Sequence, residues 1–121
     1  MPETPNPKRY DLEDRTFQFA SNIRAFVGGL PRTISHREDV KQLIRASGSV
    51  AANYIEANKA LGKKDFLMRI KISRKEAKES RLRLRLLNTH GEPDPETRRQ
   101  TLIQEALELT KIFSAILNKG T

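Results

Sequence analysis

The sequence contains no cysteine and no tryptophan in its 121 residues, and aromatic residues make up only 6% of it. The lack of cysteine excludes disulfide frameworks, thiolate zinc sites and cysteine nucleophiles, and it suits a cytoplasmic protein. No window approaches the roughly 18 consecutive apolar residues that a membrane-spanning helix requires. We therefore expect a soluble protein with no membrane partner, and the length is that of one domain.

Residues 1–9 differ in composition from the rest of the chain. They hold three of the six prolines and show neither an apolar run nor a cleavage pattern, which argues against a signal peptide or a membrane anchor. We expect a short disordered N-terminal lead over residues 1–9, followed by a single domain over residues 10–119.

Positive charge is concentrated in one segment. The formal net charge is +8, and residues 63–85 hold ten lysines and arginines against three acids, while the remainder holds 13 basic and 12 acidic residues. A chain that is nearly neutral except for one strongly basic segment is typical of proteins that bind a polyanion or an acidic surface.

Hydrophobic residues recur at spacings of three and four along most of the chain, which predicts helices rather than strands. Gly28, Gly29 and Pro31 end the first segment, and a capping-box pattern of Ser35 and Glu38 marks the start of the second. Helices are expected over residues 12–30, 35–61, 63–90 and 94–117. Long helices with short connections favour an all-α, antiparallel up-and-down four-helix bundle.

Seven cations of the third segment fall within one arc of a helical wheel, with the three acids of that segment on the other side. This basic arc consists of Lys64, Lys71, Arg74, Lys75, Lys78, Arg81 and Arg85. Two of the acids are expected to form ion pairs within the helix, Asp65 with Arg69 and Glu79 with Arg83. Within the arc, by contrast, residues of the same positive charge follow one another at successive turns. The arc predicts a nucleic-acid ligand, with RNA favoured, and because it lacks aromatic residues the contacts would go mainly to phosphates. A solvated face, or one that meets acids of a neighbouring subunit, is the alternative.

Two segments carry uncharged residues away from their apolar stripes, which indicates a second buried face. The bundle has one core, so we expect this face to contact another copy of the chain and the protein to be a homo-oligomer. Close packing inside the bundle is the alternative reason for Gly48. The predicted oligomer interface comprises Gly48, Ser49, Ala52, Asn53, Met68, Ile72, Leu82 and Leu86.

Little in the sequence points to catalysis. His36 and His90 are the only histidines, and neither has metal-ligand spacing, so solvated or capping roles are expected of them. The helical serines lack a partnering base, and no glycine-rich phosphate loop or zincin pattern occurs. We expect a non-enzymatic protein without metal or cofactor.

The sequence resembles the bacterial four-helix-bundle proteins called 23S ribosomal RNA intervening-sequence proteins, over about Tyr10 to Asn118. The resemblance rests on Leu12, Arg15, Thr16 and Phe19, on Leu30 with Pro31, on IRASGSVAANYIEANKA at residues 44–60, and on KKDFLMRIKISRKEAKESRLRLRLL at residues 63–87. It implies a left-handed bundle that assembles into a ring, commonly a pentamer, without known catalysis. A related family, the accessory proteins of diversity-generating retroelements, implies an alternative in which a basic pentamer binds reverse transcriptase and nucleic acid. A purely structural oligomer or protein–protein scaffold is a third interpretation.

Overall fold

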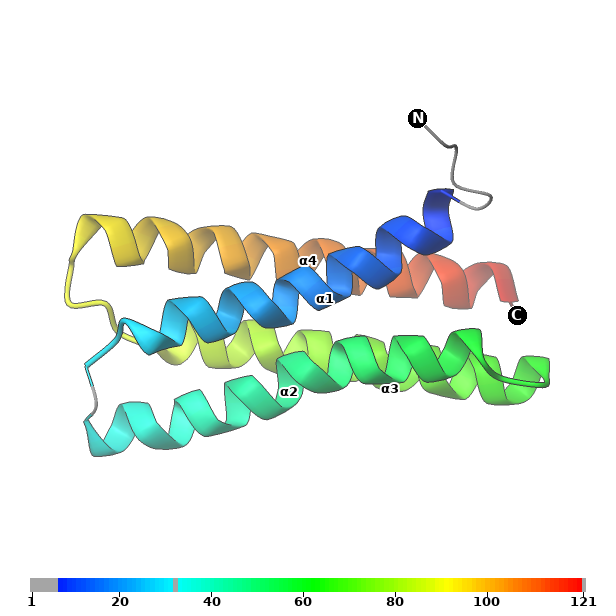
Figure 1. Ribbon diagram of the computed structural model, residues 1–121, viewed down its shortest axis with the longest axis horizontal. Helices are drawn as coiled ribbons and strands as arrows, with labels where there is room; N and C mark the ends of the chain where they lie inside the picture. Colours follow the sequence, from blue (N-terminus) through cyan, green and yellow to red (C-terminus); the bar gives the residue numbers. More distant parts are fainter. Residues whose placement is uncertain (1–6, 32, 121) are drawn as a thin grey trace.

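The computed structural model describes residues 7–31 and 33–120, and within them the chain forms four α-helices. The helices are α1 (Pro7–Gly28), α2 (Ile34–Asn58), α3 (Lys63–Leu86) and α4 (Pro93–Gly120). They run up and down, so that α1 packs on α2 and α4, and α3 packs on α2 and α4 (Figure 1). The prediction of an all-helical four-helix bundle is confirmed. Of the lead expected over residues 1–9, residues 1–6 lie outside the described part, and residues 7–9 already belong to α1.

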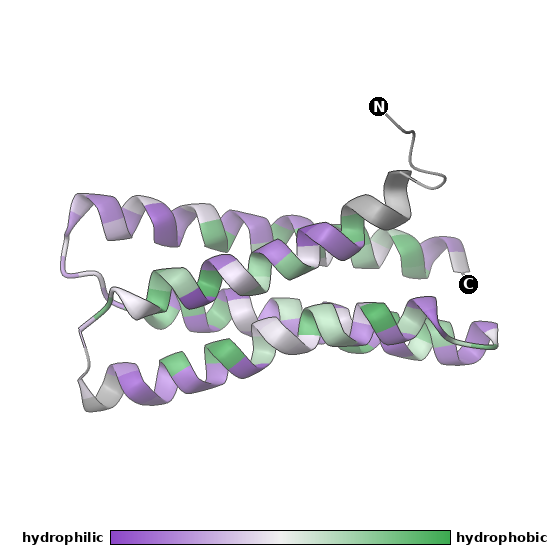
Figure 2. Cartoon of the chain, in the orientation of Figure 1, coloured by the Kyte–Doolittle hydropathy of each residue, from purple (hydrophilic) through white to green (hydrophobic). Residues whose placement is uncertain are grey.

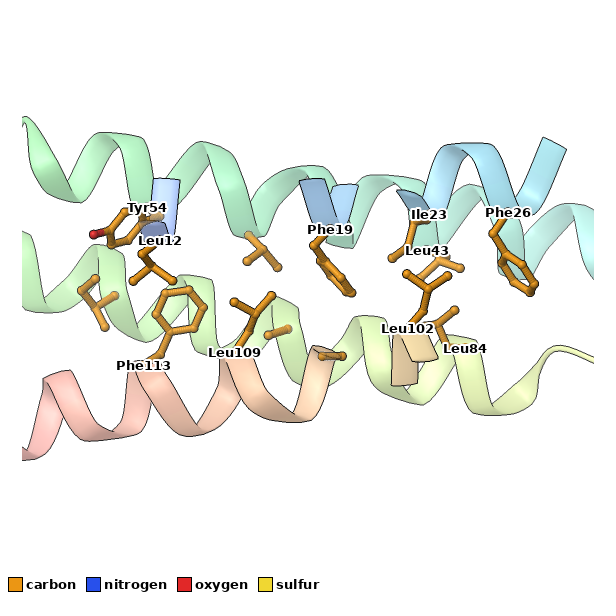
Figure 3. Packing of buried hydrophobic residues seen from close by; sticks show 14 of the residues in the cluster. Leu12, Phe19, Ile23, Phe26, Leu43, Tyr54, Leu84, Leu102, Leu109 and Phe113 are labelled. Carbon is orange, nitrogen blue, oxygen red and sulfur yellow. The ribbon is translucent and has the colours of Figure 1, made fainter. Parts of the chain in front are cut away.

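The core is a row of aromatic and aliphatic side chains along the middle of the bundle (Figure 3). Phe19, Ile23 and Phe26 of α1 and Leu109 and Phe113 of α4 are almost fully buried, as their helical spacing predicted. Hydrophobic and hydrophilic stretches alternate along each helix (Figure 2), which is the pattern of helices that bury one side. None of the four described helices combines the length and apolar character needed to cross a membrane.

Two predicted helix ends were wrong. The N-cap of α2 is Thr33 rather than Ser35: the Thr33 hydroxyl accepts a hydrogen bond from the His36 amide at 3.2 Å. Helix α3 ends at Leu86 rather than near His90, because Leu87 adopts an extended backbone (φ −71°, ψ 144°). Leu87 is nevertheless buried, so it continues the apolar stripe although the helix has ended. Leu61, the last residue of the helix expected over residues 35–61, lies fully exposed in the α2–α3 connection.

Helices α2 and α3 approach closely because α3 places small residues between them. Ser73, Ala77 and Ser80 are completely buried. The Ser73 hydroxyl donates to the Val50 carbonyl of α2 at 3.0 Å, a bond from a short side chain to the backbone of the neighbouring helix. Residues of this size let helix axes come closer than leucine or phenylalanine would.

The seam between α1 and α4 is the least extensive of the four helix contacts. It is bridged by Arg15, whose Nε and Nη2 donate to the two carboxylate oxygens of Glu105 at 2.7 and 2.8 Å. At the α3–α4 end, the Arg98 guanidinium lies 6.0 Å from the centre of the Phe26 ring.

Candidate nucleic-acid interface

The basic arc lies on the side of α3 that faces away from α2. Lys64, Lys71, Lys75, Lys78 and Arg85 are exposed, and Arg74 and Arg81 are half-buried. From Lys64 to Arg85 the arc extends along about 32 Å of helix, at 1.5 Å per residue. Arg74 turns toward α4, where its Nη1 donates to Ser114 Oγ at 3.4 Å, and Arg81 Nε is buried without a hydrogen-bond acceptor.

Throughout the described part of the chain, no member of the arc forms an ion pair with a carboxylate. Three of the four acids of α4 are engaged elsewhere, since Glu105 binds Arg15, Glu96 binds Arg99 and Glu108 approaches Lys111, while the fourth, Asp94, lies in the first turn of the helix. The positive charge of the arc is therefore balanced neither by α3 itself nor by the neighbouring helix α4.

The opposite side of α3 is paired with α2. Arg45 of α2 donates from Nη1 to Glu76 at 3.1 Å and from Nη2 to Glu79 at 2.6 Å. These hydrogen bonds, with the one to Glu76 the stronger cause, raise the pKa of the Arg45 guanidinium above its usual value. Arg83 reaches Asp39 of α2 at 3.4 Å.

The two ion pairs expected within α3 were therefore wrong. Glu79 binds Arg45 and Arg83 binds Asp39, so neither uses the partner four residues away. Arg69 donates to the Asn53 side-chain oxygen of α2 at 3.0 Å rather than pairing with Asp65. A residue on a neighbouring helix replaces the intrahelical partner in each case.

Three of the residues predicted for an oligomer interface make contacts inside the chain. Asn53 Nδ2 donates to the Ser49 hydroxyl of the same helix at 2.9 Å, and the Asn53 side-chain oxygen accepts from Arg69 of α3. A Cβ atom on Gly48 would lie 3.3 Å from Arg24 Nη2. Gly48 thus leaves room for Arg24 of α1 to lie across α2, which agrees with the alternative of close packing inside the bundle.

The other predicted interface residues lie on the surface or near it. Ala52 of α2 is exposed, and Ile72 of α3 is half-buried. Met68, Leu82 and Leu86, which we call the α3 apolar row, are each about half exposed, with Leu86 the most at 56%. On the helical wheel this row adjoins the basic arc, so one face of α3 is both basic and apolar.

Sequence reasoning missed a second exposed apolar patch, on α1 and α2. Phe17 is 61% exposed and Ile55 is 39% exposed. The hydrogen bond from Asn58 to Glu13, at 2.9 Å, and the contact of Arg24 with Gly48 fix the antiparallel register, which places Phe17 and Ile55 at the same level. A phenylalanine that lies off the stripe of its own helix was the signal that pointed to this α1–α2 apolar patch.

The histidines take structural positions. His36 is buried rather than solvated, and its Nδ1 lies 3.1 Å from the Pro31 carbonyl oxygen. The His90 ring lies 6.0 Å from the His36 ring, and His90 adopts a positive φ of 54° at the end of the bundle. Within the described residues, no group of three or more histidine, cysteine, aspartate or glutamate side chains is placed to hold a metal ion.

Comparison with known proteins identifies a matching family and a similar solved structure. A sequence model of the family described as 23S rRNA-intervening sequence protein matches residues 8–115. A crystal structure of a protein of unknown function from the S23 ribosomal protein family of Bacteroides thetaiotaomicron is 25% identical, with a TM-score of 0.76, over 92% of this chain and 98% of that one. No curated protein matches the chain.

Proposed function

Because the chain belongs to the 23S rRNA-intervening sequence protein family, we propose that it is a non-enzymatic, oligomeric four-helix bundle that binds RNA or another nucleic acid through the basic arc of α3. The observation that carries the proposal is the absence of any carboxylate partner for the seven cations, within the described residues, on a helix whose other side pairs with α2. A polyanion would supply the missing negative charge.

Phosphate groups are the chemistry that fits the arc best. Its side chains are long and mostly exposed, and they are spread along one line, as the backbone of a nucleic acid requires. The arc contains no aromatic side chain, and the exposed Phe17 lies on α1, away from it. Unpaired bases therefore have no stacking platform on this surface, and binding would depend strongly on salt and little on sequence.

The test is charge reversal on exposed arc residues only. The triple variant Lys71→Glu, Lys75→Glu, Lys78→Glu should weaken binding of a labelled single-stranded RNA by about 100-fold at low salt. Each lost phosphate contact should reduce the salt slope by about 0.7, so about 2 in total. Fluorescence anisotropy at two salt concentrations measures both quantities.

A matched control comes from exposed lysines elsewhere. The variant Lys41→Glu, Lys59→Glu, Lys119→Glu changes the net charge by the same amount on other helices and connections. It should keep most of the affinity of the original chain. Equal losses in the two variants, or no RNA binding by the unmodified protein at low salt, would contradict an RNA site on the arc.

Assembly is proposed to use the two exposed apolar surfaces. The α3 apolar row and the α1–α2 apolar patch differ in composition, so contact of one with the other would be heterologous, the kind of interface that closes rings. The family resemblance makes a pentamer the expected ring. In light scattering at micromolar concentration, Leu82→Glu with Leu86→Glu should yield single chains, whereas Leu61→Glu in the exposed connection should not change the mass.

A structural oligomer or scaffold without a nucleic-acid ligand is the second candidate. Its support is the position of Met68, Leu82 and Leu86 beside the arc, where a neighbouring copy that covered the row would also cover cations. Salt separates the two functions. If high salt dissociates the oligomer, the arc holds subunits together; if it releases only nucleic acid, the arc faces outward.

A further inference from the structure

A groove between α1 and α2 lies apart from the basic arc. It has a volume of about 740 Å³ and is formed by the C-terminal part of α1, the connection after it and the N-terminal half of α2. Its apolar lining comes from Val27, Leu30, Val40 and Ile44. The volume lies in the range of about 300 to 1,000 Å³ that small-molecule sites occupy.

The charged residues that the structure describes in this groove are cations. Arg24, Arg37 and Lys41 belong to this described lining, which contains no carboxylate. Asp39, which lies between Arg37 and Lys41 in the sequence, forms an ion pair with Arg83 of α3. Glu38 is exposed and is not part of the lining. An apolar surface with three cations and no acid is electrostatically complementary to an anion that carries an apolar body.

Local contacts fix the shape of the groove. Arg24 Nη1 donates to the Ala20 carbonyl of its own helix at 3.1 Å, and the same guanidinium lies across Gly48. His36 is buried, with its Nδ1 3.1 Å from the Pro31 carbonyl. Arg24 and the wall formed by His36 are therefore held in place without a ligand, which reduces the conformational entropy that binding would cost.

We infer that this groove binds a small amphipathic anion, a molecule with a hydrocarbon body and one acidic headgroup. The hydrocarbon would lie on Val27, Val40 and Ile44, and the headgroup would accept hydrogen bonds from Arg37, Lys41 or Arg24. Among the described lining residues there is no phenylalanine, tyrosine or tryptophan, and the one imidazole, His36, is buried with its Nδ1 against the Pro31 carbonyl, so a hydrocarbon body fits better than a nucleobase. The inference is independent of the proposed role of α3.

The probe for the test is dodecanoate below its micellar concentration. Binding to the full chain is measured by titration calorimetry, and the site is located by amide chemical-shift changes in ¹⁵N-labelled protein. We expect saturable binding, with shifts in residues 24–31 and 36–44. Arg37→Glu with Lys41→Glu should weaken binding at least 10-fold, and both residues are exposed, so the fold should persist.

Two controls separate this site from general attraction. Lys71→Glu with Lys75→Glu makes the same charge change on α3 and should leave dodecanoate affinity within about 2-fold. Dodecyltrimethylammonium has the same tail with a cationic head and should not bind to the original chain. The inference fails if the two double variants lose affinity equally, if the cationic amphiphile binds as well as dodecanoate, if the shifts fall on α3, or if no binding is seen.

Discussion

On one side of α3, acids and cations meet partners on α2; on the other side, seven cations have no acidic partner among the described residues. Glu76 is only 7% exposed and binds Arg45, whereas Lys75, its neighbour in sequence, is exposed. The two residues differ by one position and by about 100° around the helix. Their surroundings, rather than their distance along the chain, decide whether a charge stabilises the bundle or remains available for a ligand.

This difference bears on how the composition is interpreted. The bundle has acids enough to pair many of its cations, and it uses them at Arg15, Arg45, Arg83 and Arg99. The acid-free side of α3 therefore reflects placement and not a shortage of acids. Like charges at successive turns cost a few tenths of a kcal/mol per pair, and the proposed nucleic-acid ligand would offset that cost.

The largest effect is expected from reversing a charge on the paired side. Glu76→Lys places a buried cation beside Arg45 and should lower the free energy of unfolding by about 2–3 kcal/mol, less than for a fully buried pair because Arg45 is half exposed. Lys75→Glu, one residue away, should change it by no more than about 0.5 kcal/mol. Urea denaturation followed by circular dichroism measures both. Similar losses in the two variants would remove the distinction between the sides of α3.

A smaller effect of opposite sign is expected on the arc. Lys78→Glu would gain Arg74 and Arg81 as neighbours of opposite charge, four and three residues away, and should stabilise the chain by about 0.5 kcal/mol. The same variant should weaken RNA binding several-fold. Lys78→Gln, which removes charge without adding a pair, should show a weaker form of both changes. A variant that loses stability would show that Lys78 has a structural partner.

The smallest effect concerns Glu96, an acid at the end of the bundle that is paired within its own helix. The hydrogen bond from Arg99 is the main cause that lowers the pKa of Glu96 from 4.5 to about 2, with further contributions from Gln100 and Thr89. Because the folded pKa lies below the ordinary value, this contribution to stability is complete above pH 4.5 and is lost as the pH falls toward 2. Glu96→Gln should therefore slightly lower the melting temperature at pH 7.

The pH dependence provides the control for Glu96. Melting curves of the original chain and of Glu96→Gln should converge as the pH falls from 4.5 to 2, since the original chain then loses the same interaction. Curves that keep a constant separation over this interval would assign the effect of the substitution to something other than the charge of Glu96.

The spacing of apolar residues predicted the core well, because the buried side of a helix can be identified from that helix alone. Phe19, Ile23, Leu109 and Phe113 follow from positions three and four apart, and all are buried. The end of α3 did not follow, because Leu87 fits the stripe and is buried while its backbone is already extended. Periodicity reports which side chains are covered, but not whether the backbone beneath them is still helical.

Partners across helices were the part that the sequence did not reveal. Spacing alone favours Glu79 with Arg83, yet the register of α2 against α3 brings Arg45 and Asp39 closer. The same register explains the contact of Asn53 with Arg69, and the register of α2 against α1 explains the contact of Gly48 with Arg24. The composition of the basic arc, by contrast, was predictable, because a helical wheel places its residues together whichever helices are adjacent.

The bond between Ser73 and the Val50 carbonyl has a mechanical consequence. Because the serine side chain is short, rotation of α3 about its long axis would break this bond, so the bond opposes that rotation. The backbone that carries the cations is therefore held against α2, so a ligand bound there would have to order the exposed lysine and arginine side chains but not the helix beneath them.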